Sequence, residues 1–243
     1  MRPIIIIPAR LAAQRLPNKP LADIHGRSMI EWVWQRAVDA KIARVVVAAG
    51  DPEIVAVIEA AGGEAVLTPP GLPSGTDRVA YALAEIDPDE HHDIIVNLQG
   101  DLPNIESKTL VAVIDALHQV MDADITTPAA IITREEELHT NSVVKIAAEI
   151  APGETTGRAV YFSRNLIPSG DGPHYHHIGV YAFRRHALER FMKLPPSGLA
   201  LRENLEQLRA LADGMHIEMV LVDQIPQPVD TAEDLARVKE LLK

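Results

Sequence analysis

The chain has 243 residues, of which 47% are hydrophobic and only 4% aromatic, and its formal net charge is −11. This length and composition allow a sizeable core built mainly from aliphatic side chains. The acidic balance argues against a general nucleic-acid-binding protein, and no apolar run is long enough for a transmembrane helix. The absence of cysteine excludes disulfides, thiolate metal sites and cysteine nucleophiles. The N-terminal residues do not have the pattern of a signal peptide, and the lack of cysteine is consistent with the cytoplasm, which is the expected location.

The first 67 residues alternate strand-like and helix-like segments. Residues 4–7 are four isoleucines, a run typical of a buried central strand, which we expect to end at Pro8 and Ala9. A helix is predicted at 28–38, where Ser28 has the spacing of a capping box. It is followed by a strand at 44–48, a second helix at 51–61 and a third strand at 64–67. This order predicts an α/β fold with a doubly wound, mostly parallel sheet.

Three cations lie on the loop that follows the first predicted strand: Arg10, Arg15 and Lys19. Ligands of open α/β sheets bind outside the carboxyl ends of strands, and three neighbouring cations repel one another unless an anion joins them. The loop therefore predicts a polyphosphate site, with ordinary solvated charges as the alternative. The chain has neither G-x-G-x-x-G after this strand nor a P-loop, so side-chain cations must do most of the phosphate binding.

Carboxylates and hydroxyls mark the ends of later elements. Ser74 and Asp77 have the spacing of a helix cap, and such a helix start can also face a base or a phosphate. Asp101 directly follows the predicted strand 93–98, a typical place for a magnesium ligand, although it could instead cap the next helix. Thr231 and Asp234 have the spacing of a cap for the last helix, so the carboxylate of the preceding Asp230 is not needed to cap it and is available for another role.

The second half of the chain is predicted to mix strands and helices. Strands are expected at 124–132, 143–148, 160–164 and 217–222. Helices are expected at 106–121, just before the first of these strands, and at 133–139, 185–192, 202–213 and after residue 231. Residues 174–184 gather histidine, aromatic and arginine side chains in a β-rich lobe at 151–184. The interpretations are a hairpin that packs a dimer surface, a histidine metal site, and a pocket in which arginine or histidine pairs with a carboxylate and tyrosine with hydroxyls.

Six short motifs, in order along nearly the whole chain, resemble those of the sugar-acid cytidylyltransferases, most closely the 3-deoxy-manno-octulosonate (Kdo) cytidylyltransferase family, the CMP-Kdo synthetases. The motifs are Pro8-Ala9-Arg10 with Arg15-Leu16-Pro17 and Lys19-Pro20-Leu21, Ser74-Gly75-Thr76-Asp77-Arg78, Asn97-x-Gln99-Gly100-Asp101-x-Pro103, Tyr161-Phe162-Ser163-Arg164 with His177-x-Gly179-x-Tyr181, Leu205-Glu206-Gln207-Leu208-Arg209, and Val229-Asp230-Thr231 with Glu233-Asp234-Leu235.

The resemblance implies a nucleotidyltransferase that transfers CMP from CTP to the anomeric hydroxyl of Kdo, giving CMP-Kdo and pyrophosphate for lipopolysaccharide biosynthesis. It implies a nucleotide-diphospho-sugar transferase-like domain at 1–150 and 185–243, with the lobe at 151–184 used for sugar binding and dimerisation. CTP and a sugar acid are then the expected small-molecule partners, and a homodimer the expected assembly.

The resemblance also implies roles for individual residues. The catalytic residues are Arg10, Arg15, Lys19, Asp101 and Asp230. The nucleotide-binding residues are Pro8, Ala9, Arg10, Lys19, Ser74, Gly75, Arg78, Gln99 and Asp101. The sugar-acid residues are Gln99, Arg164, His177, Tyr181, Glu206 and Gln207. Asp101 and Asp230 are the ligands of Mg²⁺, the expected cofactor.

Three positions depart from the family pattern. Leu102 replaces a glutamate, His176 stands where arginine is common, and the segment 141–145 has lost a Pro-Asn pair while keeping Lys145. These departures leave open a cytidylyltransferase for a related acid, such as 8-amino-Kdo or a sialic acid. A separate alternative is a non-catalytic nucleotide-sensing module, although the presence of both Asp101 and Asp230 argues against it.

Overall fold

The computed structural model describes residues 2–12 and 15–243, so two residues of the predicted cation loop, 13 and 14, lie outside the described part. The chain forms two compact units. The first is Met1–Val111 together with Pro226–Lys243, and the second is Ala112–Ile225. The lobe predicted at 151–184 lies wholly within the second unit, and its function in sugar binding and dimerisation stays a prediction.

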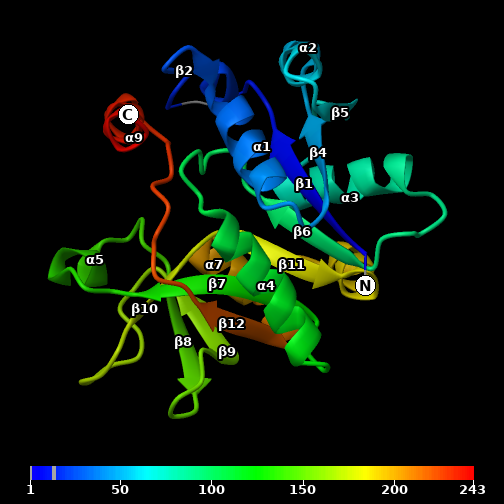
Figure 1. Ribbon diagram of the computed structural model, residues 1–243. Helices are drawn as coiled ribbons and strands as arrows, with labels where there is room; N and C mark the ends of the chain where they lie inside the picture. The colour runs from blue at the N-terminus through cyan, green and yellow to red at the C-terminus, as the bar shows by residue number, and fades with distance from the viewer. Residues whose placement is uncertain (1, 13–14) are drawn as a thin grey trace. The chain divides into compact units, whose positions relative to one another are not determined.

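The first unit is built on a parallel sheet (Figure 1). Its strand order is β6 (Ile94–Leu98), β1 (Pro3–Ala9), β4 (Arg44–Ala49) and β5 (Glu64–Leu67). The isoleucines of the central strand β1 are fully buried, as the sequence predicts.

Strand β1 ends at Ala9, as expected, but Pro8 does not interrupt the pairing, because Pro8 and Ala9 both pair in register with β4. On the other side, β6 pairs only with Pro3–Ile6. Pro8 therefore has one strand neighbour, and its missing N–H breaks no ladder.

Helices pack on this sheet and are capped as predicted. Helix α1 (Met29–Asp39) packs on β4, α2 (Pro52–Ala60) on β5 and α3 (Gly75–Ile86) on β1. Full capping boxes begin α1, α3 and the C-terminal helix α9 (Ala232–Leu241). The segment between β1 and α1 holds a short 3-10 helix, η1 (Lys19–Leu21), and a small hairpin of β2 (Asp23–Ile24) and β3 (Arg27–Ser28). Helix α4 (Ser107–Gln119) begins in the first unit and ends in the second.

The second unit is largely antiparallel. Its strand order is β10 (Tyr175–His177), β8 (Lys145–Ile150), β9 (Thr156–Ser163), β12 (Ile217–Leu221), β7 (Ile125–Ile131) and β11 (Val180–Arg184). Among the strand pairs described within this unit, only the β7–β12 pair is parallel. Strand β10 pairs with both β7 and β8. The α/β class is confirmed, with strand pairing that is mixed over the whole chain.

One predicted helix of the second unit is wrong. Residues 202–213 form two short helices, α7 (Gly198–Glu203) and α8 (Leu208–Ala212), because Asn204 adopts a left-handed backbone with φ of 54° and ends α7. Glu206 and Gln207 therefore lie in the turn between these helices. The other helices of this unit are α5 (Glu135–His139) and α6 (Arg185–Lys193). No helix in the described part of the chain is both long and apolar enough to cross a membrane.

Candidate active site

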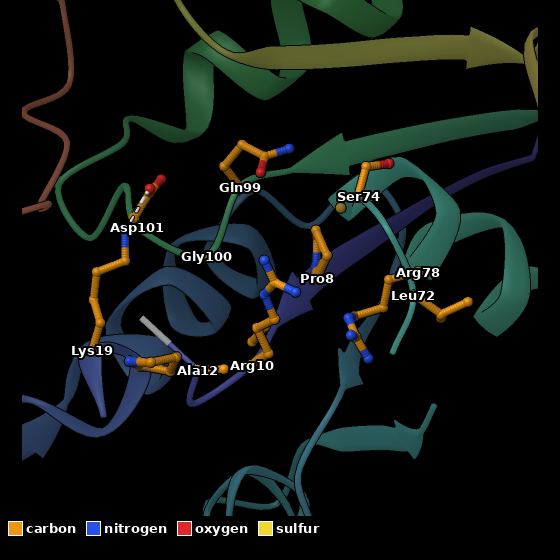
Figure 2. A pocket seen from close by; sticks show the side chains of 13 residues that line it. Pro8, Arg10, Ala12, Lys19, Leu72, Ser74, Arg78, Gln99, Gly100 and Asp101 are labelled. Atoms are coloured by element: carbon orange, nitrogen blue, oxygen red, sulfur yellow. Dashed lines mark hydrogen bonds and ion pairs between the residues drawn. The ribbon is translucent and has the colours of Figure 1, made fainter. Parts of the chain in front are cut away.

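A pocket of about 260 Å³ lies beside the carboxyl end of β1 in the first unit. All nine residues that the sequence assigns to nucleotide binding line it. They are Pro8, Ala9, Arg10, Lys19, Ser74, Gly75, Arg78, Gln99 and Asp101. Figure 2 labels seven of them around one space, and the nine come from the ends of β1 and β6, from the start of α3 and, for Lys19, from η1. Their contacts with a nucleotide stay a prediction.

Arg78 is fixed by hydrogen bonds at the base of this pocket. The residue is only 2% exposed, and its guanidinium donates to the hydroxyl of Thr68 and to the carbonyls of Pro69, at 3.2 Å, and Pro70, at 3.4 Å. Burial and the nearby positive charge of Arg10 lower the pKa of Arg78. Two like charges beside one pocket favour an anionic guest. Sequence reasoning missed Thr68, which is buried although polar.

Lys19 joins two aspartates at the other end of the pocket. Its Nζ donates to Oδ2 of Asp101 at 2.9 Å and to Oδ1 of Asp230 at 3.1 Å, and Figure 2 shows the first of these ion pairs. Burial acts to lower the pKa of Lys19, but the charges and hydrogen bonds of the two carboxylates outweigh it and raise that pKa. Arg15 Nη2 lies 3.0 Å from the other oxygen of Asp230. The two aspartates predicted to act together therefore do lie together.

The C-terminal segment reaches this place because it is packed and hydrogen-bonded there. The N–H of Val229 donates to the carbonyl of Asp101 at 3.0 Å, which brings the next residue, Asp230, beside Asp101. Val229 and Val238 are fully buried in a cluster with Ile24 and Met29. Hydrophobic burial of α9 thus determines the position of the second carboxylate.

Side chains outside the prediction orient Gln99. Its amide Nε2 donates to Oδ1 of Asn97 at 2.9 Å, and Asn97, fully buried, donates to the hydroxyl of Thr76 at 3.2 Å. Gly75 lets α3 approach closely, since a Cβ there would lie 3.3 Å from Cγ of Pro8. The signal that could have revealed Asn97 is its polar side chain in an otherwise apolar strand.

The carboxylate pair fits a hard divalent cation. Oxygens of Asp101 and Asp230 both lie within hydrogen-bond distance of one atom, Nζ of Lys19, so the two carboxylates face the same point, which the Lys19 ammonium occupies. Within residues 2–12 and 15–243, no group of three or more His, Asp or Glu side chains forms a complete metal site. Two carboxylates, with the remaining ligands from substrate phosphate and water, are the usual arrangement for Mg²⁺.

In the second unit, His177 and Tyr181 form a buried cluster. Nε2 of His177 lies 3.0 Å from the hydroxyl oxygen of Thr127, and its ring packs at 5.2 Å on Phe162 and at 5.4 Å on Tyr181. Burial lowers the pKa of His177 to about 3. Burial, with a smaller effect of the Glu206 charge, raises the pKa of Tyr181 well above 10. Both side chains are therefore neutral near pH 7.

The other predicted sugar-acid residues of this unit differ in their environment. Gln207 is 4% exposed, and its Nε2 has no hydrogen-bond partner among the described residues. The guanidinium of Arg164 instead donates hydrogen bonds to the carbonyls of Glu203, Asn204 and Asn141. Nδ1 of His176 lies 3.1 Å from Glu137, so the histidine cluster does not converge on a common metal position in the described structure.

Comparison with known proteins adds evidence from relatives. Residues 4–217 match the family described as cytidylyltransferase. The chain belongs to the cytidylyltransferase family. A Rhodospirillum rubrum protein named 3-deoxy-manno-octulosonate cytidylyltransferase is 52% identical over 240 residues, which are 99% of this chain and 95% of that relative. The protein of the same name from Rhodospirillum centenum is 55% identical over 240 residues, 99% of this chain and 93% of that one.

Solved structures resemble this cytidylyltransferase over its whole length. A CMP:2-keto-3-deoxy-manno-octonic acid synthetase complexed with CTP is 34% identical, with a TM-score of 0.91, and the match covers 100% of this chain and 98% of that one. A 4-diphosphocytidyl-2C-methyl-D-erythritol synthase from Anaerococcus prevotii is 13% identical, with a TM-score of 0.66. That match covers 99% of this chain and 98% of the other. The second likeness shows the fold alone, and together the two confirm a nucleotidyltransferase-like α/β fold.

The buried His177 is expected to make the stability of this cytidylyltransferase sensitive to acid. Below pH 6.5 the unfolded chain binds a proton at His177, whereas the folded protein does not until about pH 3. The free energy of unfolding is therefore expected to fall as the pH decreases through this window, by up to about 1.4 kcal/mol per pH unit from this group. Urea unfolding at pH 7 and pH 5 measures the change.

The variant His177→Gln should show a weaker dependence on pH over this interval. The control His186→Gln, which changes a side chain that is 71% exposed, should keep the wild-type dependence. An equal pH dependence in His177→Gln and the wild type would contradict the assignment.

Proposed function

We propose that this cytidylyltransferase transfers CMP from CTP to the anomeric hydroxyl of Kdo, giving CMP-Kdo and pyrophosphate for lipopolysaccharide biosynthesis. The observation that carries the proposal is the meeting of Asp101 and Asp230 beside a pocket lined by Arg10, Lys19 and Arg78. The full-length relatives named as Kdo cytidylyltransferases, more than half identical to this chain, support the choice of acceptor.

The reaction needs positioning and charge more than covalent catalysis. The hydroxyl oxygen of the acceptor forms a bond to the α-phosphorus of CTP and loses its proton to water, while the bond from that phosphorus to the bridging oxygen breaks and pyrophosphate leaves. Negative charge then increases on the α-phosphate and on the departing pyrophosphate. Arg10 and Lys19, which line the pocket, stabilise this charge, and Arg15 adds a more exposed cation beside Asp230.

Asp101 and Asp230 hold the Mg²⁺ of the proposed mechanism. When bound, Mg²⁺ supplies positive charge to the phosphate oxygens and makes the attacking hydroxyl more acidic. Lys19 already neutralises part of the charge of the two carboxylates and keeps them together. Ser74, Gly75 and Arg78 lie at the start of α3, where they bind the nucleoside.

Neutral and unpaired groups in the second unit suit a sugar acid. Tyr181 offers a hydroxyl and Gln207 an unpartnered buried amide, both of which can pair with sugar hydroxyls. Within the same unit, His177 contributes a neutral ring, Glu206 a carboxylate and Arg164 a positive charge. A buried polar group without a partner is costly, so a ligand that pairs with Gln207 gains affinity.

The proposed assembly is a cytoplasmic homodimer. Val160 on β9 and Ile131 on β7 are 65% and 50% exposed, although both lie in strands. Exposed apolar side chains of this kind are often covered by a partner subunit.

Titration calorimetry and a pyrophosphate-release assay test the function. CTP is expected to bind in the presence of Mg²⁺, and pyrophosphate is expected to appear when Kdo is added. Release with 8-amino-Kdo or a sialic acid, but not with Kdo, would instead favour the acceptor change suggested by Leu102 and His176. Binding of CTP without pyrophosphate release with any acceptor would indicate a nucleotide-sensing module.

A further inference from the structure

Glu203 links two segments of the second unit that are distant in sequence. Its carboxylate accepts hydrogen bonds from the Ser163 hydroxyl, at 3.0 and 3.1 Å to its two oxygens, and from the N–H of Arg164 at 3.2 Å. Ser163 is the last residue of β9 and is only 2% exposed. The C-terminus of α7 is therefore fastened to the end of a buried strand by a charged acceptor, which forms stronger hydrogen bonds than a neutral one.

Arg164 completes this link in the opposite direction. Its Nε donates to the carbonyl of Glu203 at 3.1 Å and its Nη2 to the carbonyl of Asn204 at 3.4 Å. The carbonyl of Arg164 in turn accepts from Nζ of Lys145 at 2.9 Å, and Lys145 is fully buried. Side-chain and main-chain groups of both segments are thus held together, and neither segment can shift alone.

The end of α7, which these hydrogen bonds hold at Glu203 and Asn204, is followed closely in the chain by Glu206 and Gln207. Asn204 is left-handed and ends α7, and α8 begins only at Leu208. In this turn the N–H groups of Asn204 and Leu205 both donate to the carbonyl of Ala200, so the path of residues 204–207 follows from the point at which α7 ends. The link from β9 determines that point, at Glu203 and Asn204.

We propose that Glu203 is a positioning residue for the acceptor, because through Ser163 and Arg164 it fixes the turn that carries Glu206 and Gln207. The proposal rests on the proposed sugar-acid role of these two side chains. Glu203 itself need not touch the substrate. A small displacement of binding groups in a site is sufficient to weaken a bound ligand.

Steady-state kinetics of the variant Glu203→Gln, followed by pyrophosphate release, tests the proposal. The amide keeps the volume but replaces one acceptor oxygen with a donor, which cannot accept from Ser163 or Arg164. The KM for Kdo is expected to rise by roughly tenfold, while the KM for CTP stays within about twofold of the wild type. The control Glu189→Gln changes an exposed glutamate of the same unit and should leave both values unchanged.

A second variant, Ser163→Ala, removes only the hydroxyl donor and should also raise the KM for Kdo. The KM for Kdo of the double variant should be no higher than that of Glu203→Gln alone, because both changes break the same link. An unchanged KM for Kdo in both single variants would overturn the proposal, as would a parallel rise in both KM values with a lowered melting temperature.

The variant Gln207→Ala separates this proposal from the sugar site itself. A raised KM for Kdo in Gln207→Ala, with no change in Glu203→Gln, would leave the sugar site in place and reject the positioning role. An unchanged KM in Gln207→Ala would reject the sugar-binding role of Gln207, and with it the basis of the positioning proposal.

Discussion

Replacing Asp101 by asparagine is expected to lower turnover by on the order of 10³-fold while the fold stays intact. Asparagine keeps the volume of the side chain but removes the negative charge that faces Lys19 and the proposed metal. The main-chain carbonyl of residue 101 still accepts from Val229, so the C-terminal segment keeps its place. Pyrophosphate release at saturating CTP and Kdo measures the loss, and urea unfolding checks the fold.

The matched control for this experiment is Asp89→Asn, which changes an exposed aspartate of the same unit. It should retain wild-type turnover. A normal rate in Asp101→Asn when Mg²⁺ is limiting would disprove the metal role of Asp101. A lost rate together with a much lower unfolding midpoint would show that the substitution acts through the fold.

The elements of the first unit could be predicted because their signals are local. Four consecutive isoleucines specify a buried strand wherever they pack, and serine or threonine followed three residues later by an acid caps a helix through neighbouring atoms alone. The pairing of Pro8 with β4 was not predicted, because the effect of a proline depends on which strands lie beside it.

The proximity of the two aspartates could not be derived from local signals. Lys19 is 82 residues from Asp101 and 211 residues from Asp230 along the chain, and their meeting depends on the burial of α9 and on one main-chain hydrogen bond. Only the family resemblance pointed to this pair. The break at Asn204 was equally hidden, because leucines at helical spacing continue on both sides of it.

The departures from the family pattern have different structural settings. Leu102 is 5% exposed, so this apolar side chain packs in the interior, at the position for which the resembled family pattern implies a glutamate. His176 is paired with Glu137, which also pairs with Arg134. These are changes next to the proposed functional residues Asp101 and His177, and the acceptor panel is the experiment that reveals their effect on specificity.

Replacing Lys19 by methionine is expected to lower turnover by on the order of 10²-fold. The Lys19 side chain is 18% exposed and its ammonium is already held in place by two carboxylates, so it can stabilise developing charge without reorganising. Methionine keeps most of the buried stem, so the loss reports the charge. The effect should fall mainly on kcat, since the charge to be stabilised is largest when pyrophosphate departs.

Varying Mg²⁺ distinguishes two explanations of such a loss. If Lys19 acts on the phosphates, excess Mg²⁺ will not restore the rate of Lys19→Met, because the missing charge belongs to the pocket. If Lys19 serves only as a counter-ion that keeps Asp101 and Asp230 together, a divalent cation can take that place and the rate will recover. The control Lys193→Met, on an exposed side chain of α6, should keep the wild-type rate at every Mg²⁺ concentration.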